Sequence, residues 1–264
     1  HLSYQEVENM NGQTESMRWE TKILNFLMIS SCFITTGICA CFSSALFLAN
    51  KATQEFPAIK DSIQPSVACP RVPEGWRIIK ENTFDENVNK WPLGKASDEY
   101  DTTNLMMEGG VLRYEVSAHK GVYSHQHPGL GKSLENFYMT ADIQKVSGPR
   151  DAEYGVVFRA RGERQVVFSI QDSGMVTVTP RDVGGVWQDD WLVEYSKHVE
   201  KDQSNQLVVY VHGWTYTFCI NQFFVGEVES STYPSGQFGI GIFLDAGDKA
   251  VFEIDNFNIY APEE

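Results

Sequence analysis

Two carboxylates alternate near the end of the chain, at Glu253 and Asp255. Because alternate residues of a β-strand point to the same face, both side chains would lie on one face of a strand there. Glycoside hydrolysis uses a pair of carboxyl groups on either side of the bond that is cut. A strand with the spacing E-x-D-x-E or E-x-D-x-x-E would supply a second glutamate for this chemistry, but this chain has Phe257 and Asn258 at those positions. We therefore expect no catalysis from this strand, and we expect Asp255 and Asn256 to bond backbone groups at a sheet edge.

Two further groups of side chains could bind a metal ion. His125 and His127 alternate on one strand face and could form a metal pair or be groove histidines without a metal. Asp245 and Asp248, on either side of Gly247, could give oxygen ligands to calcium in a loop at the edge of a sandwich. Apart from Ca²⁺ at this loop, the sequence indicates no cofactor.

Aromatic side chains suggest a binding surface instead. Trp187, Trp191 and Tyr195 recur at every fourth residue, and in a strand this even spacing would place all three on one face. Aromatic faces stack on sugar rings, and the polar residues between these positions could accept hydrogen bonds from sugar hydroxyls. The alternative is that individual rings belong to the core. The candidate groove residues are Trp187, Trp191, Tyr195, Trp91, Trp214 and Tyr123.

These side chains must be positioned by β-strands, because the chain from Trp76 onward shows no helical period. β-branched and aromatic runs alternate with clusters of Gly, Asp, Asn and Pro, which is typical of an antiparallel sandwich or barrel. The strands expected are 111–117, 121–125, 137–146, 153–161, 165–171, 175–180, 190–197, 205–212, 215–220, 222–227, 237–243 and 250–260.

Two short patterns add detail to these strands. Asn221-Gln222 separates two strand runs and predicts a tight hairpin turn, since Asn tolerates positive φ. Glycine alternates with apolar residues over 239–243, which suits a curved sheet where backbones approach closely.

An apolar run precedes this region. Residues 23–49 are 27 positions without Asp, Glu, Lys, Arg or His, and roughly 20 apolar residues in a helix span a bilayer. We expect a transmembrane helix over 22–50, after a polar tail over 1–21. A cleaved signal is the main alternative, although the chain stays largely apolar for eight residues beyond Cys41. A buried helix of a soluble domain is disfavoured because nothing nearby is helical enough to cover it.

The net charge of the chain excludes some classes of binding partner. The formal net charge of −14 argues against nucleic acid and against an anionic membrane surface. Residues 51–75 contain several prolines, which predicts an extended tether to a domain over 76–262. Cys69 and Cys219 are the two cysteines outside the apolar run, and they could form one bridge from tether to sandwich or stay as separate thiols.

Several segments together resemble laminin G-like, concanavalin A-like jelly-roll modules, and more closely the bacterial extracytoplasmic branch related to 3-keto-disaccharide hydrolase-like domains. The resemblance implies two curved antiparallel sheets with a concave face, where such modules bind glycans or proteins, hydrolyse glycosides or act as scaffolds. The segments are FDENVNKWPLG (84–94), EGGVLRYEV (108–116), FYMTADIQKVSGPRDAEYGVVFRA (137–160), YTFCINQFFVGEV (216–228), SGQFGIGIFL (235–244) and VFEIDNFNIY (251–260).

The sequence thus predicts an all-β, antiparallel jelly-roll sandwich preceded by one transmembrane helix. Lys and Arg flank the apolar run about equally, so the flanking charges barely fix its orientation. The resemblance to secreted modules is what places the C-terminal domain outside the cell, on a single-pass protein of the cell membrane. We expect a non-catalytic module that binds glycan or a protein partner. The alternatives are an accessory or scaffolding subunit of a membrane complex and a glycoside-active enzyme of the 3-keto-disaccharide hydrolase-like kind.

Overall fold

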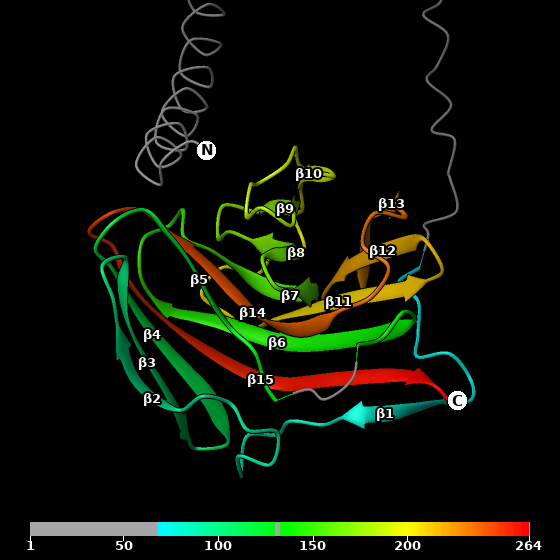
Figure 1. Cartoon of the computed structure of the whole chain (residues 1–264), viewed down its shortest axis with the longest axis horizontal. Coiled ribbons are helices and arrows are strands. Elements are labelled where there is room, and N and C mark those ends of the chain that lie inside the picture. Colours follow the sequence, from blue (N-terminus) through cyan, green and yellow to red (C-terminus); the bar gives the residue numbers. More distant parts are fainter. Residues whose placement is uncertain (1–67, 130–132, 264) are drawn as a thin grey trace, which may run out of the picture. The chain divides into compact units, whose positions relative to one another are not determined.

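The computed structural model describes residues 68–129 and 133–263. These residues form fifteen strands in two antiparallel sheets (Figure 1). The all-β, antiparallel class is the one that the sequence predicts, although the sequence indicated only twelve strands. Within the described ranges no helix has the length and apolar character needed to cross a membrane. The helix expected over 22–50, the tail over 1–21 and the tether over 51–67 lie outside the described residues.

The larger sheet has nine strands, in the order β13-β12-β11-β6-β15-β4-β3-β2, with β1 added beside β15. Figure 1 shows the long strands β6 and β15 side by side, with the end of β15 next to β1. The strands are β1 (Trp76–Lys80), β2 (Gly94–Ser97), β3 (Asp101–Glu108), β4 (Val111–Ala118), β6 (Phe137–Ser147), β11 (Asn205–His212), β12 (Thr215–Ile220), β13 (Phe223–Glu229) and β15 (Lys249–Pro262).

The smaller sheet has six strands, in the order β10-β9-β8-β7-β14-β5, so that β5 and β10 are its two edges. The strands are β5 (Val122–Gln126), β7 (Glu153–Arg161), β8 (Arg164–Ile170), β9 (Met175–Arg181), β10 (Leu192–Tyr195) and β14 (Gln237–Leu244).

The core lies between the two sheets and is built by alternation. Along β4 every second residue is buried, so that Leu112, Tyr114 and Val116 face inward. Tyr154 from the smaller sheet meets Phe252 from the larger sheet, with ring centroids 5.3 Å apart. The core therefore consists of the inward rows of both sheets, as in a β-sandwich.

Every strand expected between residues 111 and 260 is present, although β10 is shorter than expected. The sequence missed β1, β2 and β3. All four residues of β2 are exposed and β1 is exposed over its three central residues, so neither strand shows the alternation by which a half-buried strand is recognised.

The hairpin at Asn221 is confirmed. Asn221 and Gln222 have φ values of 51° and 68°, the conformation that a two-residue turn between β12 and β13 requires. The Asn221 side chain accepts a hydrogen bond from the Gln206 amide (2.8 Å) and donates one to the His198 carbonyl (2.8 Å). The turn thus also fixes the neighbouring strand and loop.

Cys69 and Cys219 form a disulfide, with 5.9 Å between their Cα atoms. The bond joins the segment before β1 to β12 in the larger sheet. Of the two alternatives that the sequence left open, the bridge is the one observed.

The sequence interpretation of Asp255 and Asn256 as edge residues is wrong. β15 is a central strand, flanked by β6 and β4. Asn256 has φ of 48° at an irregularity in the pairing of β15 with β6, and its amide donates to Asp142 Oδ2 (2.8 Å). Asp255 Oδ1 accepts a hydrogen bond from the Asn256 backbone amide (2.7 Å). These residues stabilise a bulge inside the sheet rather than a free edge.

Candidate functional site

The candidate site lies on the face of the six-stranded sheet that points away from the core, which we call the outer face. Along β7, Tyr154, Val156 and Phe158 belong to the core between the sheets, so Glu153 and Val157 lie on the outer face. Val157 nevertheless belongs to a second apolar cluster with Val167, and both are 0% exposed. Something must therefore cover the outer face.

A row of rings covers it, which we call the aromatic strip: His127, His125, Tyr123, Trp187 and Phe243. Ring centroids are 5.0 Å apart for His127 and His125, and 5.0 Å apart for His125 and Tyr123, which stack. Trp187 lies edge-on to Tyr123 at 4.9 Å, and Phe243 contacts both, at 4.6 Å from Tyr123 and 5.2 Å from Trp187. The strip is continuous; His125 is exposed and its other four rings are half-buried.

Trp187 reaches this position from the connection between β9 and β10. Its backbone forms an isolated bridge to Arg181 of β9, whose guanidinium lies 5.3 Å from the Trp187 ring centre. The strands β8, β7 and β14 separate β9 from β5 in the sheet, yet the Trp187 ring meets Tyr123 of β5. The Trp187 ring therefore lies over the outer face, where it packs with Val157 of β7 and Val167 of β8.

Two glycines of β14 make room for the rings of β5. A Cβ atom on Gly241 would lie 3.0 Å from Tyr123 Cε2, and one on Gly239 would lie 2.5 Å from His127 Nδ1 and 2.4 Å from the Gln126 carbonyl oxygen. Close backbone approach, which the sequence predicts, holds at Gly239. At Gly241 the glycine accommodates an aromatic side chain instead, so these positions let the strip lie flat on the sheet.

A polar row runs beside the aromatic strip. Glu153 is paired across the strands with Phe243, which is itself paired with Tyr123. The Glu153 carboxylate accepts hydrogen bonds from Gln171 Nε2 (3.1 Å), Ser169 Oγ (3.3 Å) and Thr177 Oγ1 (3.4 Å). Burial raises the pKa of Glu153, and these hydrogen bonds oppose that rise.

Asp190 also lies at this face, and its negative charge adds to the rise in the pKa of Glu153. Asp190 Oδ1 accepts a hydrogen bond from Thr179 Oγ1 (2.6 Å). Acceptor oxygens are therefore held in place beside the rings, where they could bond the hydroxyl groups of a ligand.

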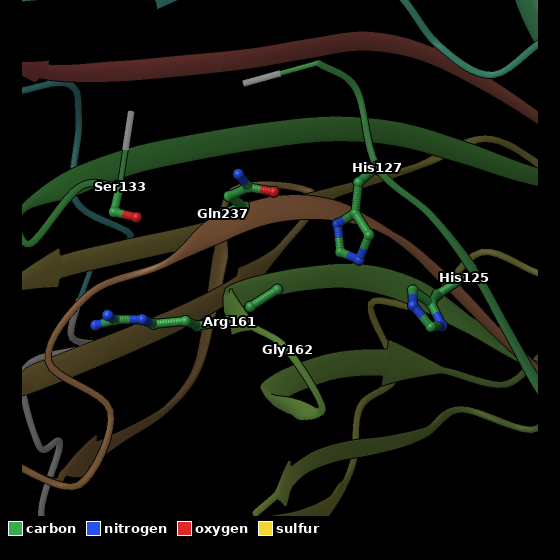
Figure 2. Close-up of a pocket in the computed structure, with 7 residues that line it drawn as sticks. His125, His127, Ser133, Arg161, Gly162 and Gln237 are labelled. Atoms are coloured by element: carbon green, nitrogen blue, oxygen red, sulfur yellow. The ribbon is translucent and has the colours of Figure 1, made fainter. Parts of the chain in front are cut away.

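A pocket of about 270 Å³ adjoins the histidine end of the aromatic strip. Figure 2 shows the two imidazoles at one end of this pocket and Arg161 with Ser133 at the other, with Gln237 between them. The lining residues are His125, His127, Ser133, Ala160, Arg161, Gly162 and Gln237.

Desolvation favours the neutral form of both imidazoles of the strip. Desolvation lowers the pKa of His125 to about 4, helped by the charges of His127 and Arg181; one side of the ring faces solvent while the other lies against Tyr123. Desolvation also lowers the pKa of His127, against a hydrogen bond between Nδ1 and the Phe238 carbonyl (2.9 Å). In that bond the neutral ring must donate from Nδ1, which leaves Nε2 as an acceptor.

Of the six aromatic residues that the sequence proposes, the structure brings two together, Tyr123 and Trp187. Trp91 is 2% exposed in the core, where it packs on Phe257 (5.3 Å) and its Nε1 donates to Asn82 Oδ1 (3.0 Å). Its assignment to a groove is wrong, because no face of its ring is open to a ligand.

The interpretation that Trp187, Trp191 and Tyr195 share a strand face is also wrong. Only Leu192–Tyr195 is a strand, and Trp191 turns into the core against Tyr216 (5.4 Å) and a second tyrosine. Tyr195 is 75% exposed on the edge strand β10 and makes no ring contact with the strip among the described residues. Trp214 is 52% exposed, in the turn between β11 and β12 of the other sheet.

Asp245 and Asp248 lie in the turn between β14 and β15, where the Asp248 amide donates to the Asp245 carbonyl oxygen (3.1 Å). In the part of the chain that the structure describes, no three His, Cys, Asp or Glu residues gather as metal ligands. Calcium at this turn stays a prediction from the sequence.

The site residues expected from the sequence did not include Phe243, Arg161, Arg181 and Gln237. The sequence pattern around Phe243 could have indicated a site residue, because Phe243 follows Gly239 and Gly241 at alternate positions. Two alternating glycines before a large residue leave space on the same sheet face beside its ring. No signal marked Arg161, because its direction depends on an irregularity in the pairing of β7 with β8.

The chain matches no protein-family model and no curated protein sequence. Among solved structures, SCLam, a non-specific endo-β-1,3(4)-glucanase from family GH16, has a TM-score of 0.54 at 8% identity, over 74% of this chain and 94% of that one. The catalytic domain of an endo-1,3-β-glucanase from Thermotoga petrophila RKU-1 has a TM-score of 0.51 at 10% identity, over 72% of this chain and 99% of that one. A protein of unknown function with a galectin-like fold from Bacillus subtilis has a TM-score of 0.50 at 11% identity, over 71% and 100%. These likenesses show the fold alone: the described domain is an antiparallel β-sandwich of the kind that these structures share.

Proposed function

We propose that this domain binds a glycan, without catalysis, on the outer face of the six-stranded sheet. The observation that carries the proposal is the aromatic strip, in which Trp187 and Tyr123 meet on the outer face beside acceptor oxygens held by hydrogen bonds. Sugar rings present C–H faces that stack on aromatic rings and hydroxyl groups that need hydrogen-bond partners. The solved structures with this fold include two endo-glucanases, which is consistent with a glycan as ligand.

The proposal places the domain outside the cytoplasm, anchored by residues 23–49. The disulfide between Cys69 and Cys219 supports this location, because disulfides persist in oxidising compartments and are rare in the cytosol. The apolar run supports the anchor by its length.

The non-catalytic part of the proposal rests on where the carboxylates lie. Glu253 is on the larger sheet, where its carboxylate pairs with Arg113 (2.8 Å), so it does not share a face with the aromatic strip. Glu153 is on the correct face, but three neutral donors hold it as a hydrogen-bond acceptor. We therefore assign Glu153 to ligand binding.

One observation favours hydrolysis as a second candidate function. Burial and the charge of Asp190 raise the pKa of Glu153, and a carboxyl group with a raised pKa can act as a general acid. In that case Glu153 would protonate the leaving oxygen and Asp190 would be the second carboxyl group. Turnover of an oligosaccharide by the wild type that is lost in Glu153→Gln, with binding retained, would establish this alternative.

The experiment that tests the proposal is binding of the full chain, in mild detergent, to an array of neutral and acidic oligosaccharides. We expect binding to a restricted set of glycans without release of shorter products. Absence of binding to every glycan, together with co-purification of a stoichiometric membrane protein, would contradict the proposal and favour an accessory subunit of a membrane complex.

A further inference from the structure

The pocket beside the aromatic strip differs in charge from the chain as a whole. The chain has a formal net charge of −14, yet the pocket lining contains Arg161, two imidazoles and no Asp or Glu. Arg161 takes part in no ion pair within residues 68–129 and 133–263. The carboxylate of Glu163, two residues along the chain, is bound by Arg181 Nη1 at 3.0 Å. The charge of Arg161 is therefore left available to a ligand.

A bulge at the nearby residue Arg159 sets the direction of the Arg161 side chain. The pairing of β7 with β8 is irregular between Phe158 and Arg161, and Arg159 has φ of 58° there. This bulge turns Arg159 fully into the interior, while Arg161 is exposed at the pocket. Bulges of this kind re-aim side chains next to functional sites.

Arg159 also holds the two segments that form the pocket wall. Its guanidinium donates to the carbonyl oxygens of Leu134 (2.9 Å), Glu135 (2.6 Å) and Pro234. Leu134 and Pro234 are close in sequence to the lining residues Ser133 and Gln237. A buried guanidinium bound to three carbonyl oxygens from two segments makes this wall a fixed part of the structure.

The other end of the pocket offers a different chemistry. His127 donates from Nδ1 to the Phe238 carbonyl oxygen, which leaves Nε2 as an acceptor, and Figure 2 shows this imidazole apart from Arg161. The pocket thus presents a cation with a hydroxyl donor at one end and an acceptor at the other. A molecule that satisfies both ends carries an anionic group and a hydroxyl group on one compact ring.

We propose that this pocket binds an acidic sugar residue, with the sugar carboxylate on Arg161 and Ser133 and a ring hydroxyl on His127. The inference rests on the proposed glycan binding and names the class of glycan: one that carries a uronic acid. The planar fork of a guanidinium fits a carboxylate with two parallel hydrogen bonds, which gives direction as well as charge. The remainder of the glycan would continue along the aromatic strip from His125 to Tyr123 and Trp187.

The test is a comparison of matched ligands on the full chain in mild detergent. An array pairs neutral gluco-, xylo- and galacto-oligosaccharides with the same backbones carrying one glucuronate or galacturonate. In the pair that binds most tightly, we expect the uronate member to bind about tenfold more tightly than its neutral counterpart, as a charge-assisted hydrogen bond predicts. Arg161→Gln should remove this preference, Arg161→Lys should restore part of it, and Arg150→Gln, an exposed arginine outside the pocket lining, should leave it intact.

The outcomes separate the two proposals. Equal affinity for the neutral and uronate members of every pair would overturn the acidic-sugar pocket while leaving glycan binding in place. A preference that survives in Arg161→Gln, or that falls equally in Arg150→Gln, would also overturn it. No binding to any member of the array would overturn the glycan proposal and this inference with it.

Discussion

The ring of Trp187 stands edge-on to the ring of Tyr123, with 4.9 Å between centroids and 89° between planes. The two residues come from opposite sides of the six-stranded sheet: Tyr123 is on the edge strand β5, and Trp187 is on the connection after β9. Their contact closes a layer of rings over Val157 and Val167 on the outer face. This layer gives the sheet a second, smaller apolar cluster with a surface that a ligand can reach.

Tyr123→Phe should leave stability unchanged or raise the free energy of unfolding by up to about 1 kcal/mol. The Tyr123 hydroxyl is buried, has no hydrogen-bond partner among the described residues, and desolvation raises its pKa well above 10. An unsatisfied buried donor is unfavourable, whereas the ring contacts persist in phenylalanine. Urea unfolding measures the difference, and a loss above about 1 kcal/mol would mean that the hydroxyl has a partner.

Gly241→Ala should lower the free energy of unfolding by about 1–3 kcal/mol, the usual cost of overpacking. The added Cβ would lie 3.0 Å from both Tyr123 Cε2 and Val157 Cγ2, so the ring layer must shift. Gly121→Ala is the control, because no atom lies within 4 Å of its added Cβ. Equal effects of the two substitutions in urea unfolding would contradict the close fit at Gly241.

Reduction of the Cys69–Cys219 disulfide should lower stability by about 2–5 kcal/mol, since the bond closes a loop with a sequence separation of 150 residues. The urea midpoint of the wild type should fall when reductant is added. The double variant Cys69→Ser/Cys219→Ser should already unfold at the lower midpoint and should not respond to reductant. An equal fall in the urea midpoint of both proteins on adding reductant would mean that the fall does not come from the Cys69–Cys219 disulfide.

Lys145 of β6 and Asp172, in the turn after β8, form a buried ion pair at 2.9 Å, with side chains 4% and 2% exposed. Tyr154 donates to the same carboxylate (3.1 Å), so the cluster joins the two sheets. Lys145→Met should cost about 3–5 kcal/mol, because it leaves a buried charge unpaired. The double variant Lys145→Met/Asp172→Asn should recover part of this loss, since the amide that replaces the carboxylate is neutral and its oxygen can still accept from Tyr154. A loss below about 1 kcal/mol in the single variant would contradict the pairing.

Most strands with a buried face could be predicted from their β-branched and aromatic runs, although β3 was missed despite the alternating burial in its middle. β7 and β11 have the bounds expected from the sequence, and the Asn221 turn has the positive φ that its sequence requires. β2 could not be predicted because all four of its residues are exposed. Local patterns therefore define the interior strands, and pairing partners define the outer ones.

The site could be predicted only in part, because its residues come from separate strands and a connection that meet only in the folded sheet. Trp187 and Tyr123 were candidates by residue type, but their contact depends on a connection that crosses several strands. Trp91 has the same residue type, and its burial depends on the side chain of Asn82, which accepts its Nε1–H. Residue type alone does not distinguish a core tryptophan from a binding one.

The central claim, glycan binding on the aromatic strip, is tested most directly by titrating the full chain in mild detergent with its best-binding oligosaccharide, for the wild type and two tryptophan variants. We predict that Trp187→Ala loses affinity by at least about fivefold, as expected for loss of a stacking ring worth about 1–3 kcal/mol. Trp214→Ala, which removes an exposed ring from the other sheet, should bind as the wild type does. Circular dichroism would first establish that both variants are folded. Unchanged affinity in folded Trp187→Ala, or an equal loss in Trp214→Ala, would contradict the account.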